Sequence, residues 1–359
     1  MRLEDADLLE GLVRAFSPTY HEGEAVRYLV GVMRKLGYAA SIDPAGNAVG
    51  TRGSGENEIL LLGHIDTVPG EVPVRREGDL LYGRGTVDAK GPLACFTAAA
   101  ARVTPPPGWR FTVIGAVAEE GDSRGALFLR DSHRPKALII GEPSRWDKIA
   151  LGFKGSLWSE YTLRQPVAHT AGRQASASDA AFDFWTRVRA WCAHFNSGQT
   201  STFTQVTPSL RGMESGSDGF TDTARLRMNF RLPPGLSPDD LTAQLNALAG
   251  GANLGFGDRI PAFRSEKNTP LVRGFLGAIR AEGGEPAFSL KTGTSDMNLV
   301  APIWGCPAVA YGPGDSSLDH TPDEHTSLDE YQKSIRVLAR MLAQAESLFP
   351  EAALPSSGG

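Results

Sequence analysis

Hydrophobic and polar positions form alternating blocks along the first 151 residues of the chain. Continuous apolar runs predict buried strands near residues 59–63, 111–117 and 137–141, and segments with helical apolar spacing lie between them. Strands that alternate with helices in this way are typical of an α/β fold. We therefore expect a mostly parallel sheet that is covered by helices.

Two predicted helices carry capping signals at their starts. Thr19 and Glu22 are spaced as a capping box for a helix that would reach about Leu36. Ser327 and Glu330 have the same spacing before an amphipathic segment near the end of the chain. Each pair predicts that the hydroxyl and the carboxylate satisfy the first free backbone N–H groups of the helix.

The pattern changes near residue 152, where shorter alternating segments begin. Residues 157–164, 203–210 and 224–232 predict strands, and residues 178–195 and 237–248 predict helices. One side of the first helix would carry its large apolar residues, namely Phe182, Trp185, Val188 and Cys192. Strands followed by helices in this order predict a small α+β insert.

These blocks predict a discontinuous organisation. We expect one domain from residues 1–151 plus 262–350, the α+β insert at 152–261, and a disordered tail at 351–359. A chain of 359 residues is longer than one ordinary hydrophobic core requires, so two domains are expected.

Side chains that can bind metal ions follow several predicted strands. His64 and Asp66 follow one apolar run, Glu119 and Glu120 follow the next, and Glu142 follows the third. Taken singly, each has an ordinary interpretation: a surface histidine, a solvated turn, or a strand that simply ends in a turn. Together they fall at the carboxyl edge of an open α/β sheet, which is where sites assemble.

Two further segments supply candidate ligands. Asp88 follows a glycine-containing turn and precedes an alanine-rich helix near 89–103, so it is either a helix N-cap or a carboxylate that bridges two ions. His320 and His325 lie in a polar loop after a predicted strand, and they compete for the last ligand position. Two histidines and three carboxylates suit two divalent ions about 3.5–4 Å apart, with zinc favoured.

The order of these motifs resembles the dinuclear-zinc metallopeptidase family of acetylornithine deacetylase, succinyl-diaminopimelate desuccinylase, aminoacylase and glutamate carboxypeptidase. The resemblance rests on residues 63–68, 83–88, 119–121 and 141–143 and extends over nearly the whole chain. It implies a zinc-peptidase-like catalytic domain and a lid at 152–261 that forms a homodimer.

The resemblance also implies a role for each candidate residue. His64 and Glu142 would hold one ion, Glu120 and His320 the other, and Asp88 would bridge them. Asp66 would orient His64, and Glu119 would be the general base that later protonates the leaving amine. The family pattern His-x-x-x-Glu favours His320, with Glu324, over His325, and the Asp88–Ala89 peptide bond is expected to be cis.

Substrate-binding residues follow from the same resemblance. His169 would reach the partner subunit's site and stabilise the oxyanion, and Arg231 would bind a substrate carboxylate through its paired donors. Thr294, Ser295 and Asp296 would hold the amino-acid part, although an ordinary turn is the alternative for this loop. Asp218 stands where the family often has Asn, which leaves one oxyanion contact open.

Within the family, residues 141–147, 151–155 and 291–298 resemble the LysK-type hydrolases. Those enzymes release lysine or ornithine from the γ-carboxyl of the C-terminal Glu of a small acidic amino-group carrier protein. We therefore expect an amide hydrolase that acts in the last step of lysine or arginine biosynthesis. Two divalent ions, zinc or alternatively cobalt, would be its cofactors, and the acidic carrier would be its partner.

Composition limits the other possibilities. The net charge of −5 argues against nucleic acid as a partner, and no apolar run reaches the length of a membrane span. Three cysteines that lie far apart and a start without an apolar core predict a cytoplasmic protein.

The sequence is also compatible with other functions. The chain could be an acetylornithine deacetylase, a succinyl-diaminopimelate desuccinylase or a dipeptidase of the same family. It could also be a catalytically inactive, metal-stabilised binding protein, although Glu119 beside a full ligand set argues against that class. An exported peptidase would need a signal sequence.

Overall fold

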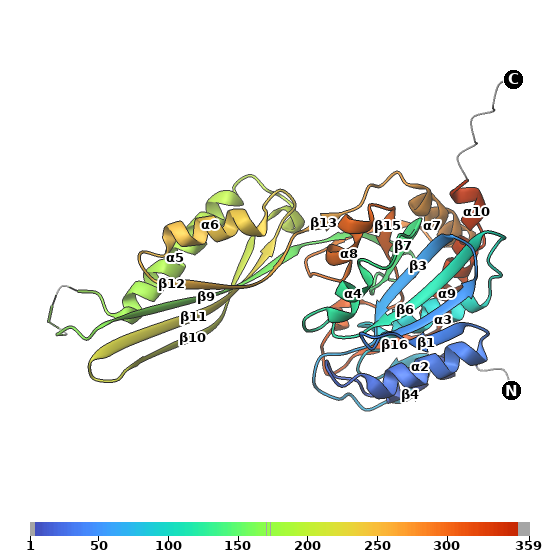
Figure 1. Cartoon of the computed structure of the whole chain (residues 1–359), viewed down its shortest axis with the longest axis horizontal. Helices are drawn as coiled ribbons and strands as arrows, with labels where there is room; N and C mark the ends of the chain where they lie inside the picture. The colour runs from blue at the N-terminus through green and yellow to red at the C-terminus, as the bar shows by residue number, and fades with distance from the viewer. Residues whose placement is uncertain (1–3, 170, 173, 351–359) are drawn as a thin grey trace, which may run out of the picture. The chain divides into compact units, whose positions relative to one another are not determined.

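The computed structural model of the chain describes residues 4–169, 171–172 and 174–350, and these form two compact units (Figure 1). Unit 1 lies within Met1–Leu151, Ser265–Ser289 and Leu299–Gly359, and unit 2 comprises Gly152–Arg264 and Leu290–Asn298. Unit 2 thus takes in residues 262–264 and 290–298 in addition to the expected insert at 152–261. The tail at 351–359 lies outside the described residues.

A large mixed sheet forms the centre of unit 1. Its order is β1 (Ala39–Ile42), β2 (Ala48–Gly53), β6 (Trp109–Ala116), β3 (Asn57–His64), β7 (Ala137–Gly141), β15 (Ala308–Ala310) and β8 (Lys148–Phe153). The four strands β6, β3, β7 and β15 are parallel, whereas the flanking pairs are antiparallel. The predicted strands at 59–63, 111–117 and 137–141 are confirmed, as is the helix-covered, mostly parallel sheet.

Helices surround this sheet (Figure 1). They are α1 (Asp5–Arg14), α2 (Gly23–Lys35), α3 (Lys90–Ala101), α4 (Arg124–Leu129), α7 (Pro270–Ala281), α8 (Met297–Trp304), α9 (Leu328–Leu342) and α10 (Ala345–Leu348). Residues 90–100 of α3 are all buried, which explains its alanine-rich composition. A small sheet of β4 (Arg75–Glu77), β5 (Leu80–Tyr82) and β16 (His325–Ser327) and the short turn η2 (Ser316–Leu318) complete the unit.

The two capping predictions are wrong in part. Helix α2 begins at Gly23, and the Thr19 hydroxyl donates instead to the Asp66 carboxylate at 2.9 Å. At α9, Ser327 does cap the helix by accepting from the Glu330 N–H, but Glu330 accepts from the N–H groups of Trp146 and Gly314. In both cases a partner distant in sequence replaces the local one.

Unit 2 is a four-stranded antiparallel sheet with two helices on one face (Figure 1). The strand order is β10 (Thr207–Ser217), β11 (Thr221–Leu232), β9 (Gly155–Pro166) and β12 (Asn253–Ile260), and the helices are α5 (Ala177–Phe195) and α6 (Pro238–Leu248). Two short strands, β13 (Phe263–Arg264) and β14 (Ala287–Lys291), pair with β8.

The core of unit 2 lies between its helices and one sheet face. Phe184, Val188 and Cys192 of α5 pack there, whereas Phe182 is 63% exposed, so its predicted place on the apolar side is wrong. The helix period places Phe184 rather than Phe182 in line with Val188. The predicted strand at 203–210 also begins later, because Thr202–Thr204 form the turn η1. No helix among the described residues is both long and apolar enough to cross a membrane.

Glu58 at the start of β3 is expected to make the free energy of unfolding depend on pH. Its carboxylate is buried and receives hydrogen bonds from Thr112 at 2.7 Å and from Arg110 at 3.2 Å, and it pairs with His133 at 3.1 Å. Burial opposes ionisation, but these three partners outweigh it and lower the pKa to about 2. A depressed folded-state pKa contributes stability above the unfolded value, and that contribution is lost as the pH falls toward 2.

We therefore expect Glu58→Gln to lower the free energy of unfolding at neutral pH, by on the order of 3 kcal/mol. The amide keeps an acceptor oxygen but removes the charge that His133 and Arg110 face. Chemical denaturation at a series of pH values measures this. The variant should lose less stability than the wild type between about pH 4.5 and about pH 2. Equal slopes in the two proteins would contradict the assignment.

Candidate metal centre

The candidate ligands of unit 1 lie where the parallel strands end. His64 is the last residue of β3, Glu142 directly follows β7, and Glu119 and Glu120 follow β6 after a turn at Ala118. Ala118 has a positive φ of 61°, and the chain turns through residues 118–121, where the Gly121 N–H donates to the Ala118 oxygen at 3.2 Å. Asp88 precedes α3, and His320 lies in the loop after η2.

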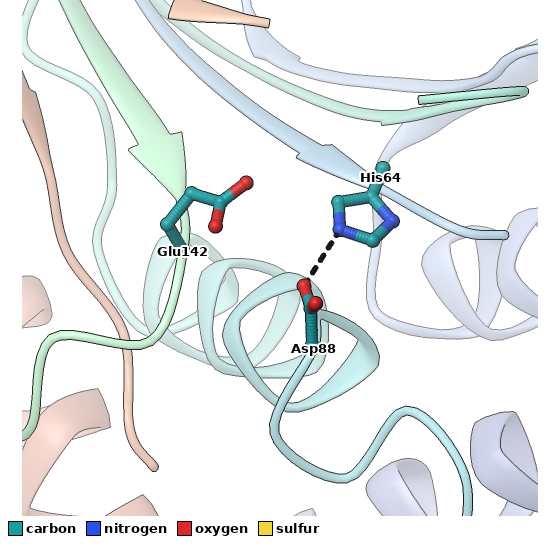
Figure 2. A group of neighbouring side chains, drawn as sticks. All are labelled: His64, Asp88 and Glu142. Atoms are coloured by element: carbon teal, nitrogen blue, oxygen red, sulfur yellow. Dashed lines mark hydrogen bonds and ion pairs between the residues drawn. The ribbon is translucent and has the colours of Figure 1, made fainter. Parts of the chain in front are cut away.

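The first group of candidate ligands consists of His64, Asp88 and Glu142 (Figure 2). His64 is buried, and its Nε2 lies 3.1 Å from Oδ1 of Asp88. One ligand atom from each of the three residues lies within 4.8 Å of the others. Three segments that are 24 and 54 residues apart in sequence therefore converge on one point.

The second group consists of Asp88, Glu120 and His320. His320 Nε2 lies 2.9 Å from Oδ2 of Asp88 and 2.8 Å from Oε1 of Glu120. Asp88 thus directs one carboxylate oxygen to each histidine and belongs to both groups. This is the disposition that a carboxylate bridging two ions requires.

The contacts within the two ligand groups shift the pKa values of His64, Asp88 and His320. Hydrogen bonds to Asp88 and Glu120 raise the pKa of His320 to about 10, although partial burial opposes this. Burial also opposes the charged form of His64, yet Asp66 and Asp88 raise its pKa well above the usual value. Asp88 has a lowered pKa, because His320 and His64 outweigh the effect of burial. The carboxylates therefore attract positive charge strongly at this position.

Asp66 holds the backbone that carries Glu119 and Glu120. Its Oδ1 accepts from the Glu119 N–H at 3.0 Å, and its Oδ2 accepts from the Glu120 N–H at 3.1 Å and from the Thr19 hydroxyl. The nearer partner of His64 Nδ1 is the Asp66 backbone oxygen at 2.9 Å, whereas the carboxylate lies 3.6 Å away. Asp66 therefore orients His64 through its carbonyl and orients the Glu119–Glu120 turn through its carboxylate.

Glu324 holds the loop that presents Asp88, a contact that the sequence patterns did not predict. It is buried, and its Oε1 accepts from the N–H groups of Gly85, Val87 and Asp88, while its Oε2 pairs with Arg84 at 2.7 Å. The alternative of Asp88 as a helix N-cap is wrong, because Ala89 occupies that position. The expected cis peptide bond between Asp88 and Ala89 is confirmed.

Replacing Glu324 with Gln is expected to weaken metal binding about 10- to 100-fold, as is usual when a group that orients a ligand is lost. The amide nitrogen would face the Arg84 guanidinium, so we also expect a lower unfolding temperature. Metal titration and thermal unfolding measure the two effects. Asp323→Asn, a change of the adjacent exposed carboxylate, is the matched control. Unchanged metal affinity in Glu324→Gln would contradict this role.

The structure distinguishes the two histidines that compete for the last ligand position. His320 belongs to the second group, whereas His325 lies in β16 with its Nδ1 2.7 Å from the Asp323 oxygen and its ring against Tyr82. His320 has a positive φ of 62°, an uncommon conformation for a residue other than glycine. Within the described residues, His320 is therefore the better candidate.

The expected substrate-binding residues belong to unit 2. Arg231 near the end of β11 donates to Thr294 Oγ1 at 2.7 Å, and Thr294 donates to the Lys154 oxygen. Ser295 and Asp296 in the same loop are buried. The loop is joined to unit 2 by Asn298, whose amide donates to the backbone of residues 153, 154 and 261.

The remaining two candidates of unit 2 lie at its surface. His169 follows β9 and is exposed, with its Nδ1 accepting from the Ala171 N–H. Asp218 forms the turn between β10 and β11, where its Oδ1 accepts from the N–H groups of Phe220 and Thr221. The structure therefore gives Asp218 a turn-forming contact.

The donor set suits two divalent ions. Each group offers one imidazole nitrogen and carboxylate oxygens, the mixture of ligands that zinc and similar ions favour. The shared carboxylate of Asp88 and the turn that brings Glu119 beside Glu120 fit a dinuclear arrangement with one further carboxylate available for proton transfer.

Comparison with solved structures shows the same fold. The aminopeptidase PepT from Bacillus cereus matches 96% of this chain and 99% of its own, with a TM-score of 0.77 and 19% identity. The YXEP protein of Bacillus subtilis, described as a dinuclear metal binding peptidase of the M20 family, matches 96% of this chain and 98% of its own, with a TM-score of 0.71 and 11% identity.

Sequence comparison finds much nearer relatives. A LysW-lysine hydrolase from Deinococcus radiodurans is 43% identical over 94% of this chain and 96% of its own length. A putative LysW-lysine/LysW-ornithine hydrolase from Thermococcus kodakarensis is 38% identical over 98% of this chain and 94% of its own length. The family model described as Peptidase family M20/M25/M40 matches residues 60–344, and the chain belongs to that family.

Proposed function

We propose that this protein is a dinuclear-metal amide hydrolase that releases lysine, ornithine or both from the γ-carboxyl of the C-terminal Glu of a small acidic amino-group carrier protein. The assignment as a dinuclear-metal amide hydrolase is supported by the two ligand groups that share Asp88, with Glu119 beside them. The names of relatives that are 43% and 38% identical over nearly the full chain support the substrate.

The reaction requires a water activated for attack on an amide carbonyl. When bound, the two ions supply Lewis-acid polarisation and lower the pKa of that water. His64, Glu142 and Asp88 would hold one ion, and Glu120, His320 and Asp88 the other. Zinc is the ion that this donor set favours, with cobalt as the alternative.

Proton transfer is assigned to Glu119. Asp66 holds the Glu119 N–H and so orients the turn from which this carboxylate projects. In the proposed sequence, Glu119 accepts a proton from the attacking water and then delivers it to the leaving amine of lysine or ornithine. One carboxylate thus serves first as base and then as acid.

Residues of unit 2 are proposed to bind the substrate. His169 would donate to the oxyanion in the site of the partner subunit, a contribution often worth several kcal/mol. Arg231 would bind the substrate carboxylate, and Thr294, Ser295 and Asp296 would contact the released amino acid. We further propose a homodimer formed through residues 152–261 and a cytoplasmic location, the latter supported by three free cysteines.

A turnover assay on metal-loaded protein tests the proposal. Its substrates are the carrier bearing γ-linked lysine, the same carrier bearing ornithine, and free N-acetylornithine. We expect amino acid to be released from the carrier and little from the small amide. Cleavage of N-acetylornithine with the carrier ignored would contradict the substrate but keep the metal chemistry.

A further inference from the structure

One face of the unit 2 sheet carries a row of arginines. In an antiparallel ladder, residues two apart share a face and directly paired residues lie on the same face. Arg225, Arg227 and Arg231 of β11 therefore share one face, and the register adds Arg164 of β9, which lies beside this row opposite Thr223. Adjacent same-face residues on a strand are about 7 Å apart, so the row from Arg225 to Arg231 spans about 20 Å.

This face is opposite the one that the helices cover. Leu226, Met228 and Phe230 lie on the other face of β11 and are buried in the core with α5 and α6. Between Arg227 and Arg231, the arginine side of the strand carries Asn229, which is buried. Arg164, Arg225 and Arg227 are exposed, and Arg231 is half-buried. We name the exposed sheet face that carries these four residues the arginine face.

Charge is segregated between the two sides of unit 2. Among the residues that the register pairs, the arginine face carries Arg164, Arg225, Arg227 and Arg231 against two acidic residues, Glu160 and Glu214, which lie opposite Arg227 and Arg225. Helices α5 and α6 carry four aspartates against two arginines. The arginine face is therefore net positive on a chain of net charge −5.

A cavity of about 510 Å³ opens on the same face. Trp158, Glu160 and Arg227 line it together with Gly255 and Gly257, and Gly255 has open space where a side chain would stand. The Arg227 guanidinium lies 4.9 Å from the centre of the Trp158 ring. Tryptophan and arginine beside a cavity are the residue types that contribute most to binding at protein interfaces.

We infer that the arginine face is the docking surface for the acidic body of the amino-group carrier protein. The inference rests on the proposed function, which supplies an acidic macromolecular substrate. Clustered arginines recognise acidic segments through paired hydrogen bonds to carboxylates, and their field steers an acidic partner toward the surface. The row ends at Arg231, the residue proposed to bind the substrate carboxylate. The strand β11 would therefore bind the carrier protein at one end and the attached amino acid at the other.

The test is a charge reversal that leaves Arg231 in place. In the variant Arg225→Glu/Arg227→Glu, we expect KM for the lysine-bearing carrier to rise about tenfold while kcat stays within about twofold. Charged residues at the rim of an interface mainly change the rate at which the two proteins associate, and they have little effect on the rate of the chemical step. Raising NaCl from about 0.05 M to about 0.3 M should raise the wild-type KM severalfold and the variant KM much less.

Arg189→Glu is the matched control, because this exposed arginine lies on α5, away from the arginine face. It should leave KM within about twofold of the wild type. An unchanged KM in the double variant, or a fall in kcat without a rise in KM, would overturn the docking surface while wild-type turnover still upholds the proposed function. A wild type that releases nothing from the carrier would overturn both. Circular dichroism and thermal unfolding establish that each variant is folded.

Discussion

Replacing Glu119 with Gln is expected to lower kcat on the order of 10³-fold while both metal ions remain bound. The amide fills the same space and keeps the backbone contact of residue 119 with Asp66, but it cannot accept the proton of the attacking water. Glu119 stands outside both ligand groups found among the described residues, so metal content should not change. Steady-state kinetics and elemental analysis of the purified variant measure the two quantities.

The matched control for this change is Glu71→Gln, which alters an exposed glutamate elsewhere in unit 1. It should leave kcat and metal content at wild-type values. If Glu119→Gln turned over normally, another group would have to move the proton. If it instead lost metal, Glu119 would be a ligand and its assignment as base would be wrong.

Asp88→Asn should have the second large effect, the loss of both ions and a fall in activity of roughly 10⁴-fold, since the shared ligand serves both ions. An amide offers one neutral oxygen in place of the two carboxylate oxygens that face His64 and His320. Glu142→Gln is the graded comparison, because Glu142 belongs to only one of the two groups. Metal bound per chain should therefore fall to near zero in Asp88→Asn and to about one ion in Glu142→Gln.

Equal metal loss in the two variants would contradict the bridging position of Asp88. Thermal unfolding in the presence of a chelator separates a ligand effect from misfolding. Both variants should be folded without metal, although Asp88→Asn should unfold at a lower temperature than the metal-free wild type, because it removes the pairs that Asp88 forms with His64 and His320.

The strands that carry the ligands could be predicted because their sequences consist almost entirely of apolar residues. Residues 59–63 and 137–141 are buried on both faces, and parallel strands that are covered on both sides have continuous apolar runs. The family resemblance then supplied the ligands at the ends of these strands. Asp88 could not be assigned from its surroundings alone, since a carboxylate before a helix is most often a cap.

Contacts between distant segments could not be predicted in the same way. Thr19 was expected to cap a helix, but its hydroxyl instead helps to hold Asp66, which is 47 residues away. The His-x-x-x-Glu spacing from His320 to Glu324 favoured His320 as the ligand, but it did not predict what the Glu324 carboxylate binds. Its three backbone partners at residues 85–88 precede it by 236–239 residues in the sequence. No local pattern encodes such contacts, because each depends on the register of the sheet and the path of the loops.

The proposed chemistry depends on two ions that share Asp88, and anomalous diffraction at the zinc edge from crystals of zinc-loaded protein tests this arrangement most directly. It predicts two peaks on either side of the Asp88 carboxylate, one beside His64 and Glu142 and the other beside Glu120 and His320. A single peak, or a second peak at His325 with Asp88 bound to only one ion, would contradict it.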